Sequence, residues 1–288
     1  MRLEMLQVAR QSPRSLSEAA DLVRTFVRGQ LHQCGGFSDR AGNPDLYYTV
    51  FGLGCMMALD EPVPVDQVAL WLDHFGSGEG LDLVHLSALA RCWSGIGRPG
   101  PGVAMLPRIE AYRARSGGYN VSEGAEYGNP YGNFMALGAY QDLGMEVPLP
   151  QELVEGCLQC VSADGGFSND PGLPVGNVPA LAAAESVLRN LGAETPERAC
   201  AWLQAQFYTE GGFFAVPAAP MPDLLSTATA LHALAGMGVE YGEMKEPCLD
   251  YIDSLWINQG GFYGNWGDVN LDCEYTFYGL LALGHLSL

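Results

Sequence analysis

The sequence has very few basic residues. Lys245 is the only lysine, and 14 Lys and Arg residues stand against 33 Asp and Glu residues, which gives a formal net charge of −19. Phosphate backbones and anionic membrane surfaces are bound by clusters of Lys and Arg. We therefore expect neither nucleic acid nor an anionic membrane surface as a partner.

Long apolar runs are absent as well. No uninterrupted run approaches the roughly 18 residues of a membrane-spanning helix, so we expect no transmembrane segment. The start of the chain, MRLEMLQVARQSPRSLSEAADL, has no apolar h-region, which predicts a cytoplasmic protein without a secretory signal. The eight cysteines are scattered, and Cys157 and Cys160 have no second CxxC with which to complete a zinc site. We interpret the cysteines as buried free thiols.

The chain does contain a repeat. Gly-Gly pairs begin at residues 35, 117, 165, 211 and 260, and each pair is followed by Phe or Tyr. The last three intervals are 48, 46 and 49 residues, and the first, of 82 residues, contains a degenerate copy that starts at Gly76. The 288 residues thus divide into six units that average 48 residues. Self-similarity at such a period predicts a repeat architecture.

Each unit has the pattern of a helical hairpin. A first segment with apolar residues at helical spacing, such as ERACAWLQAQFY, ends at the Gly-Gly pair, where a residue of positive φ commonly terminates a helix. After a polar loop, an Asp or Asn begins a second, more apolar segment and is expected to cap its helix. The six expected caps are Asp45, Asp82, Asn129, Asn177, Asp223 and Asp272.

The second helices are expected to form the inside of the molecule. They are rich in Ala, Gly and aromatic residues, which indicates burial on both sides. A stack of repeats exposes two apolar ends unless it is capped or closed into a circle, and here the first and last units resemble each other. We therefore predict an all-α fold, an (α/α)6 toroid formed by residues 1–288 as one domain, with an inner and an outer ring of helices.

Two segments are similar to a known family. GGFSDRAGNPDLYYTVFGL from Gly35 and EYTFYGLLAL from Glu274 resemble the squalene/prenyltransferase repeats, found in the β subunits of protein farnesyl- and geranylgeranyltransferases and in class II terpene cyclases. The likeness covers essentially the whole chain and is nearest to the β subunits. It implies the toroid fold, a prenyl diphosphate as substrate and a helical partner subunit, with a homodimer as the alternative. A shared scaffold does not define the reaction, however.

The resemblance also implies a metal site. In the transferases of this family an Asp, a Cys and a His bind zinc, which lowers the pKa of a substrate thiol. Asp45 and His85 match the Asp and the His, whereas Tyr47 stands in place of the Cys. A carboxylate, Glu274 or Asp272, would then complete a mixed N/O site for zinc or magnesium. The alternatives are that Asp45 is only an N-cap and that His85 is a hydrogen-bonded histidine of its helix.

Substrate-binding residues are predicted in the same region. The resemblance places Arg40 and Tyr48 on the residues that hold the diphosphate, with an ordinary surface position as the alternative for Arg40. Tyr47, Tyr131 and Tyr275 lie on second helices, where aromatic side chains are expected to line a central funnel that accepts a long apolar chain and stabilises a carbocation. The alternative is that half of the aromatic side chains pack against the outer helices.

Asp272 and Glu274 are the candidate catalytic residues. Only the last unit carries a second carboxylate two residues after its cap. Two neighbouring carboxylates raise the pKa of one of them, which suits proton donation or cation binding, whereas solvated charges at a loop end are the alternative. Glu185, an acid in the middle of a buried helix, receives no role from the sequence.

Three functions are compatible with these residues. The first, which we favour, is a prenyltransferase-like enzyme that binds an isoprenyl diphosphate in the funnel and transfers the prenyl chain. The second is a catalytically silent toroid that binds an isoprenoid or a protein. A terpene cyclase ranks third, because the sequence contains no DxDD motif.

Overall fold

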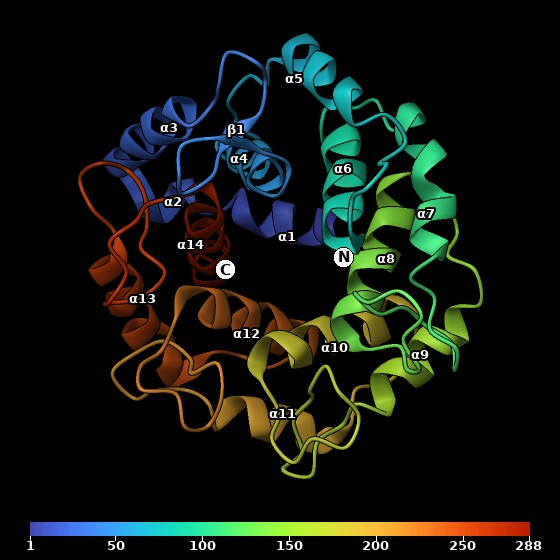
Figure 1. Ribbon diagram of the computed structural model, residues 1–288. Helices are drawn as coiled ribbons and strands as arrows, with labels where there is room; N and C mark the ends of the chain where they lie inside the picture. The colour runs from blue at the N-terminus through green and yellow to red at the C-terminus, as the bar shows by residue number, and fades with distance from the viewer.

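The computed structural model describes residues 1–288, and the chain forms a closed ring of helices (Figure 1). The inner ring consists of α4 (Leu46–Ala58), α6 (Leu83–Gly95), α8 (Pro130–Asp142), α10 (Val178–Asn190), α12 (Leu224–Gly236) and α14 (Cys273–Leu286). Each inner helix packs against the next, and α14 packs against both α12 and α4. The predicted toroid, with its first and last units side by side, is therefore confirmed.

An outer ring of shorter helices surrounds the inner one. Its members are α3 (Ala20–Gly29), α5 (Val65–Leu72), α7 (Leu106–Glu110), α9 (Pro150–Leu158), α11 (Glu197–Gln204) and α13 (Lys245–Leu255). Short 3₁₀ segments continue or precede some of them, namely η1 (Ser17–Ala19), η2 (Asp73–Phe75), η3 (Gly100–Met105) and η4 (Gly242–Met244). Each outer helix packs against an inner helix, so the apolar side chains between the two rings form the core.

Each inner helix begins at its expected cap. In all six, the side chain of the capping Asp or Asn accepts a hydrogen bond from the backbone N–H three residues later. This bond satisfies one of the N–H groups that a helix start leaves free. Because an outer helix returns the chain between successive inner helices, the six inner helices run parallel. Their capped ends form one rim of the ring, and their carboxyl ends form the opposite floor.

The Gly-Gly-aromatic turns fix the loops to the inner ring. Gly35, the first glycine of its pair, has φ of 109°, a conformation that favours glycine, and the other four first glycines also have positive φ. The aromatic residue that follows is fully buried, and the N–H of Phe37 donates to the Thr49 hydroxyl at 2.9 Å. In the first unit the loop also forms a small antiparallel pair, β1 (Phe37–Ser38) with β2 (Pro44–Asp45).

The first helix of the N-terminal segment lies inside the ring. The segment comprises α1 (Arg2–Ala9) and α2 (Pro13–Leu16), and α1 packs against α14 and α4. Figure 1 shows α1 crossing the space that the inner helices enclose. This placement has no counterpart in the repeat pattern, and it closes the floor of the ring.

The remaining expectations concern cysteines and membrane helices. All eight cysteines are free and most are buried, Cys157 and Cys160 included, whereas Cys34 is exposed. None of the helices combines the length and the apolar character that crossing a bilayer requires.

Candidate functional site

The inner ring encloses a cavity of about 200 Å³ that is partly open to solvent. Of its 21 lining residues, 14 are hydrophobic. All lining residues except Arg2 and Met5, which belong to α1, stand at the second, fifth, sixth or ninth position after an N-cap. These positions follow helical spacing, so every inner helix turns the same stripe toward the centre. The cavity is therefore built in layers.

The layer at the rim is formed by the residue two positions after the N-cap of each inner helix. It consists of Tyr47, Val84, Tyr131, Pro179, Leu225 and Glu274. Below it lie the aromatic side chains of the fifth and sixth positions, where Phe51 packs against Phe277 and Tyr278 with ring centroids 6.0 and 5.6 Å apart. The layer at the floor, next to α1, is formed by the residue nine positions after each N-cap: Gly54, Arg91, Gly138, Ser186, His232 and Leu281. The cavity thus has an apolar, aromatic middle and a more polar floor.

The predicted substrate-binding tyrosines divide into two groups. Tyr47 and Tyr131 lie in the cavity wall. Tyr48 and Tyr275 occupy the third position after their caps and are not lining residues. Tyr275 instead packs beneath Arg40, whose Cζ lies 5.2 Å from the centroid of its ring. Helical geometry accounts for the difference, because one residue along a helix turns the side chain by about 100°.

Glu274 stands at the rim position of α14 but is not itself a lining residue of the cavity; it pairs with Tyr47, which is one, across the point where the ring closes. The Tyr47 hydroxyl donates to Glu274 Oε1 at 2.6 Å. Burial, followed by the nearby charge of Asp272, raises the pKa of Glu274 above its ordinary value, although the Tyr47 hydrogen bond opposes the shift. Burial likewise raises the pKa of Tyr47, so that hydroxyl stays protonated and remains a donor. Glu274 therefore keeps its proton to a higher pH than a solvated carboxyl does.

Asp272 has a different environment. Its Oδ1 accepts from the Tyr275 N–H at 2.8 Å, and its Oδ2 accepts from Arg40 Nε at 2.7 Å. Burial raises the pKa of Asp272 although both contacts oppose this, and its residue is only 1% exposed. Because both of its oxygens are occupied, Asp272 caps α14 and anchors Arg40.

Arg40 is held by two carboxylates. Besides Asp272, its Nη2 donates to Asp268 Oδ2 at 2.9 Å. Burial opposes the charged form of Arg40, but the two carboxylates outweigh it and raise the pKa of Arg40 above its ordinary value. The guanidinium lies at the rim, as expected, yet its charge is already neutralised within the protein. A diphosphate bound there has to compete with two carboxylates.

The expected metal ligands do not form a metal site. Asp45 caps α4 and accepts from the Tyr48 N–H at 2.9 Å, whereas His85 Nδ1 contacts Asp82 Oδ1 at 2.8 Å. No group of three or more His, Cys, Asp or Glu side chains is placed to hold a metal ion. Asp45 and His85 therefore have no third ligand beside them, and the expected carboxylates Glu274 and Asp272 accept hydrogen bonds from Tyr47 and Arg40 instead, so the residues do not fit the family's zinc site.

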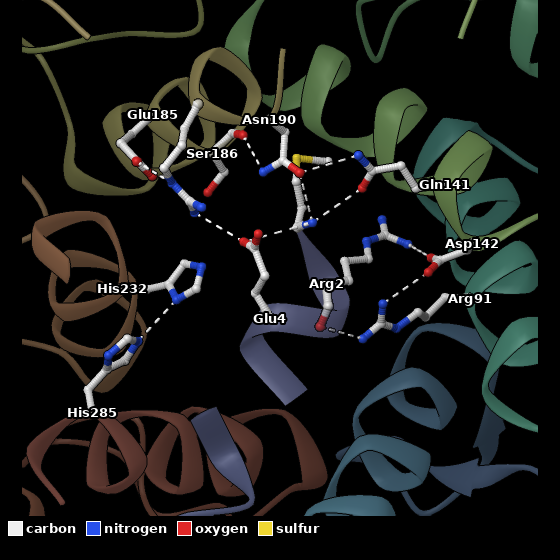
Figure 2. Close-up of polar contacts among 12 residues, drawn as sticks. Arg2, Glu4, Arg91, Gln141, Asp142, Glu185, Ser186, Asn190, His232 and His285 are labelled. Carbon is white, nitrogen blue, oxygen red and sulfur yellow. Dashed lines mark hydrogen bonds and ion pairs between the residues drawn. The ribbon is translucent and has the colours of Figure 1, made fainter. Parts of the chain in front are cut away.

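The floor of the cavity is a polar network around α1 (Figure 2). Arg2 Nη1 and Arg91 Nη1 donate to the two oxygens of Asp142, at 2.9 and 3.0 Å. On the other side of α1, Arg189 bridges Glu4 and Glu185, at 3.1 and 2.7 Å. These contacts join α1 to α6, α8 and α10, so the helix is fixed in place by charges that are mostly buried.

This network explains the buried Glu185, to which the sequence assigned no role. Its Oε1 accepts from Arg189, and its Oε2 has no hydrogen-bond partner. Burial raises the pKa of Glu185 above its ordinary value, although Arg189 opposes this. Sequence reasoning also missed Arg2, Arg91 and His232 as cavity residues. Counting positions from each N-cap would have identified the last two, because the ninth residue faces the centre in each unit.

Comparison with known proteins agrees with this architecture. A family model described as the prenyltransferase alpha-alpha toroid domain matches residues 3–92 and 134–286. No curated protein sequence matches the chain.

Solved structures share the fold at low sequence identity. The type II terpene cyclase MstE from Scytonema, in its apo form, superposes with a TM-score of 0.63 at 12% identity, over 95% of this chain and 98% of that chain. A variant of MstE in complex with geranylgeranyl dihydroxybenzoate gives 0.65 at 12% identity, over 100% and 98%. A protein from Actinoplanes gives 0.58 at 14% identity, over 94% and 98%. At these identities the likeness concerns the fold alone.

Proposed function

The chain belongs to the prenyltransferase alpha-alpha toroid domain family, and on this basis we propose that it binds an isoprenoid chain in the central cavity. The observation that carries the proposal is the aromatic wall between the rim and the floor. The lining positions run from the second to the ninth residue after each N-cap, a rise of about 10 Å along a helix, so the aromatic wall surrounds one part of an isoprenoid chain between the rim and the floor. Burial of such a chain against aromatic and aliphatic side chains supplies most of the affinity.

The rim favours an isoprenoid whose head group is not a diphosphate. Diphosphates are usually held by several charge-assisted hydrogen bonds, and Arg40 is already paired with Asp268 and Asp272. The rim layer itself adds a carboxyl, Glu274, and no cation. A neutral or hydrogen-bonding head group therefore fits better. MstE, which shares the fold, has been solved with geranylgeranyl dihydroxybenzoate, a prenyl chain on an aromatic head, and this supports the proposal by analogy only.

Prenyl transfer from a diphosphate is the second candidate function. It is supported by the resemblance, which places Arg40 and Tyr48 on the residues that hold the diphosphate, and by the contact of Arg40 with Asp272 at the start of α14. For chemistry at this rim we propose Glu274 as the acid, because its Oε1 accepts from Tyr47 and its pKa is raised by burial. We do not assign that role to Asp272, since both of its oxygens accept hydrogen bonds.

Calorimetric titration with geranylgeraniol and geranylgeranyl diphosphate tests the proposal. We expect saturable binding of the alcohol, with a negative heat-capacity change because apolar surface is buried. The variant Ala183→Phe, which fills the wall at a sixth position, should abolish binding. Ala41→Phe, in an exposed loop, is the matched control and should bind normally.

The same titration separates the two candidates. Tighter binding of the diphosphate that is lost in Arg40→Ala would support prenyl transfer instead of a neutral head group. Absence of binding for both ligands by the folded protein would refute an isoprenoid site altogether.

A further inference from the structure

A chain of three hydrogen-bonding side chains leads from the protein interior to the floor of the cavity. Tyr241, in the segment after α12, contacts His285 of α14, with 2.9 Å between its hydroxyl and Nδ1. His285 Nε2 lies 3.0 Å from Nδ1 of His232 on α12. His232 is a cavity-lining residue, and its remaining nitrogen, Nε2, is buried without a hydrogen-bond partner. The exposed fraction of His232 is 7%.

One carbonyl group fixes the direction of all the hydrogen bonds in this chain. The Tyr241 hydroxyl lies 3.0 Å from the backbone oxygen of Leu231, which can only accept, so the single hydroxyl proton points there. Tyr241 then accepts from His285, whose proton is on Nδ1. The other nitrogen of His285 must in turn accept from Nδ1 of His232. This assignment follows from satisfying every contact at once.

The consequence is that His232, a lining residue of the cavity, has a buried Nε2 with a lone pair that no protein group occupies. Figure 2 shows the His232 ring between His285 and the floor network around α1. The charged groups near it are Arg189, Glu4 and the amino group of Met1. Burial is the main reason why its pKa falls to about 4, so the imidazole is neutral near pH 7. A neutral acceptor beside cationic groups suits a neutral hydrogen-bond donor, whereas a ligand ammonium would face Arg2, Arg91 and Arg189.

We infer that His232 Nε2 accepts a hydrogen bond from a hydroxyl group at the end of the isoprenoid that reaches the floor. This inference rests on the proposed function and specifies its ligand as a hydroxylated isoprenoid. Ser186, at the ninth position of α10, and Thr229, three residues before His232 on α12, also line the cavity and carry hydroxyl groups. The apolar remainder of the ligand lies along the aromatic wall. A hydrocarbon end would leave the buried nitrogen without a partner.

Two matched ligands test the inference. Geranylgeranyl methyl ether has no hydrogen-bond donor, and its ω-hydroxylated derivative adds one at the far end. With the full chain near pH 7, we expect the hydroxylated ligand to bind about two- to tenfold more tightly, the contribution of one neutral hydrogen bond. In His232→Leu the preference should disappear. Tyr241→Phe, which removes the group that orients the chain, should reduce it.

A spectroscopic measurement on the unmodified protein does not depend on whether the variants fold. Isotope-labelled imidazole nitrogens should show His232 Nε2 without a proton, and its resonance should shift with the hydroxylated ligand and not with the ether. Equal affinity for the two ligands, or a proton on Nε2 in the free protein, would overturn the inference and leave isoprenoid binding intact. If neither ligand bound, the proposed function itself would fail and the inference with it.

Discussion

Acidification should destabilise the folded protein through the buried pair His232 and His285. Burial lowers the pKa of His232 from 6.5 to about 4, and burial together with the neighbouring His232 lowers that of His285 to about 3. In the unfolded chain both titrate near 6.5. Below that pH the unfolded state therefore binds protons that the folded state does not. The contribution of each neutral histidine to stability is complete above pH 6.5 and is lost as the pH falls toward 4.

The expected loss is large compared with the stability of a typical domain. One proton taken up only by the unfolded chain changes the free energy of unfolding by about 1.4 kcal/mol per pH unit. Between pH 7 and pH 5, the two histidines together account for about 4 kcal/mol. Typical unfolding free energies are only about 5–15 kcal/mol. Carboxyl groups with raised pKa values, such as Glu185 and Glu274, stabilise the folded protein as the pH falls. Their contribution is the same in the wild type and in a variant that lacks the two histidines, so it cancels when the two proteins are compared.

The assay is urea unfolding, followed by circular dichroism, of the wild type and of a double variant, His232→Leu with His285→Leu. From pH 7 to pH 5 the wild type should lose about 4 kcal/mol more than the double variant. From pH 8 to pH 7 the two proteins should differ by only about 0.3 kcal/mol, because both histidines are then mostly neutral in either state. Equal losses in the acidic interval would show that these imidazoles are not held neutral, and the argument from burial would be wrong.

Three further predictions concern the floor and the helix caps. Asp142→Asn leaves two buried guanidinium groups without their carboxylate and should lower the free energy of unfolding by about 3–5 kcal/mol in urea. The control, Asp66→Asn, changes a side chain that is 87% exposed and should lower it by at most about 1 kcal/mol. Similar losses in the two variants would contradict the floor network. In Gly284→Ala the new methyl group meets the backbone of α1, so limited proteolysis should release the N-terminal segment faster, while Gly29→Ala, where the space is open, should change nothing. Asp45→Ala removes an N-cap and should lower the free energy of unfolding by about 1 kcal/mol, and an unchanged urea midpoint would argue against the cap.

The architecture was readable from the sequence because its signals are local. Helical periodicity, the Gly-Gly stops and the capping residues Asp45 to Asp272 each act within a few residues, and the repeat multiplies them six times. The similarity of the first and last units was also enough to predict closure, since only a ring makes them neighbours. The position of cavity residues is likewise set by counting from each cap.

The chemistry of the site depended on contacts that only the closed ring creates. Arg40 meets Asp272, and Tyr47 meets Glu274, across more than 220 positions of sequence. The expectation that Arg40 holds a diphosphate did not include the carboxylates that neutralise it. His232 and His285 are isolated histidines in the sequence and become a directed pair only when α12 packs against α14.

The sequence by itself determined the number of hairpins, the start of every inner helix and the closure of the circle, because short-range hydrogen bonds and apolar periodicity specify them. Tertiary structure decided which charges are neutralised, which helix closes the floor and which imidazole nitrogen is left without a partner. Those outcomes depend on the distance between side chains from separate units and on the water that packing removes from around them, and neither quantity is encoded within any single repeat.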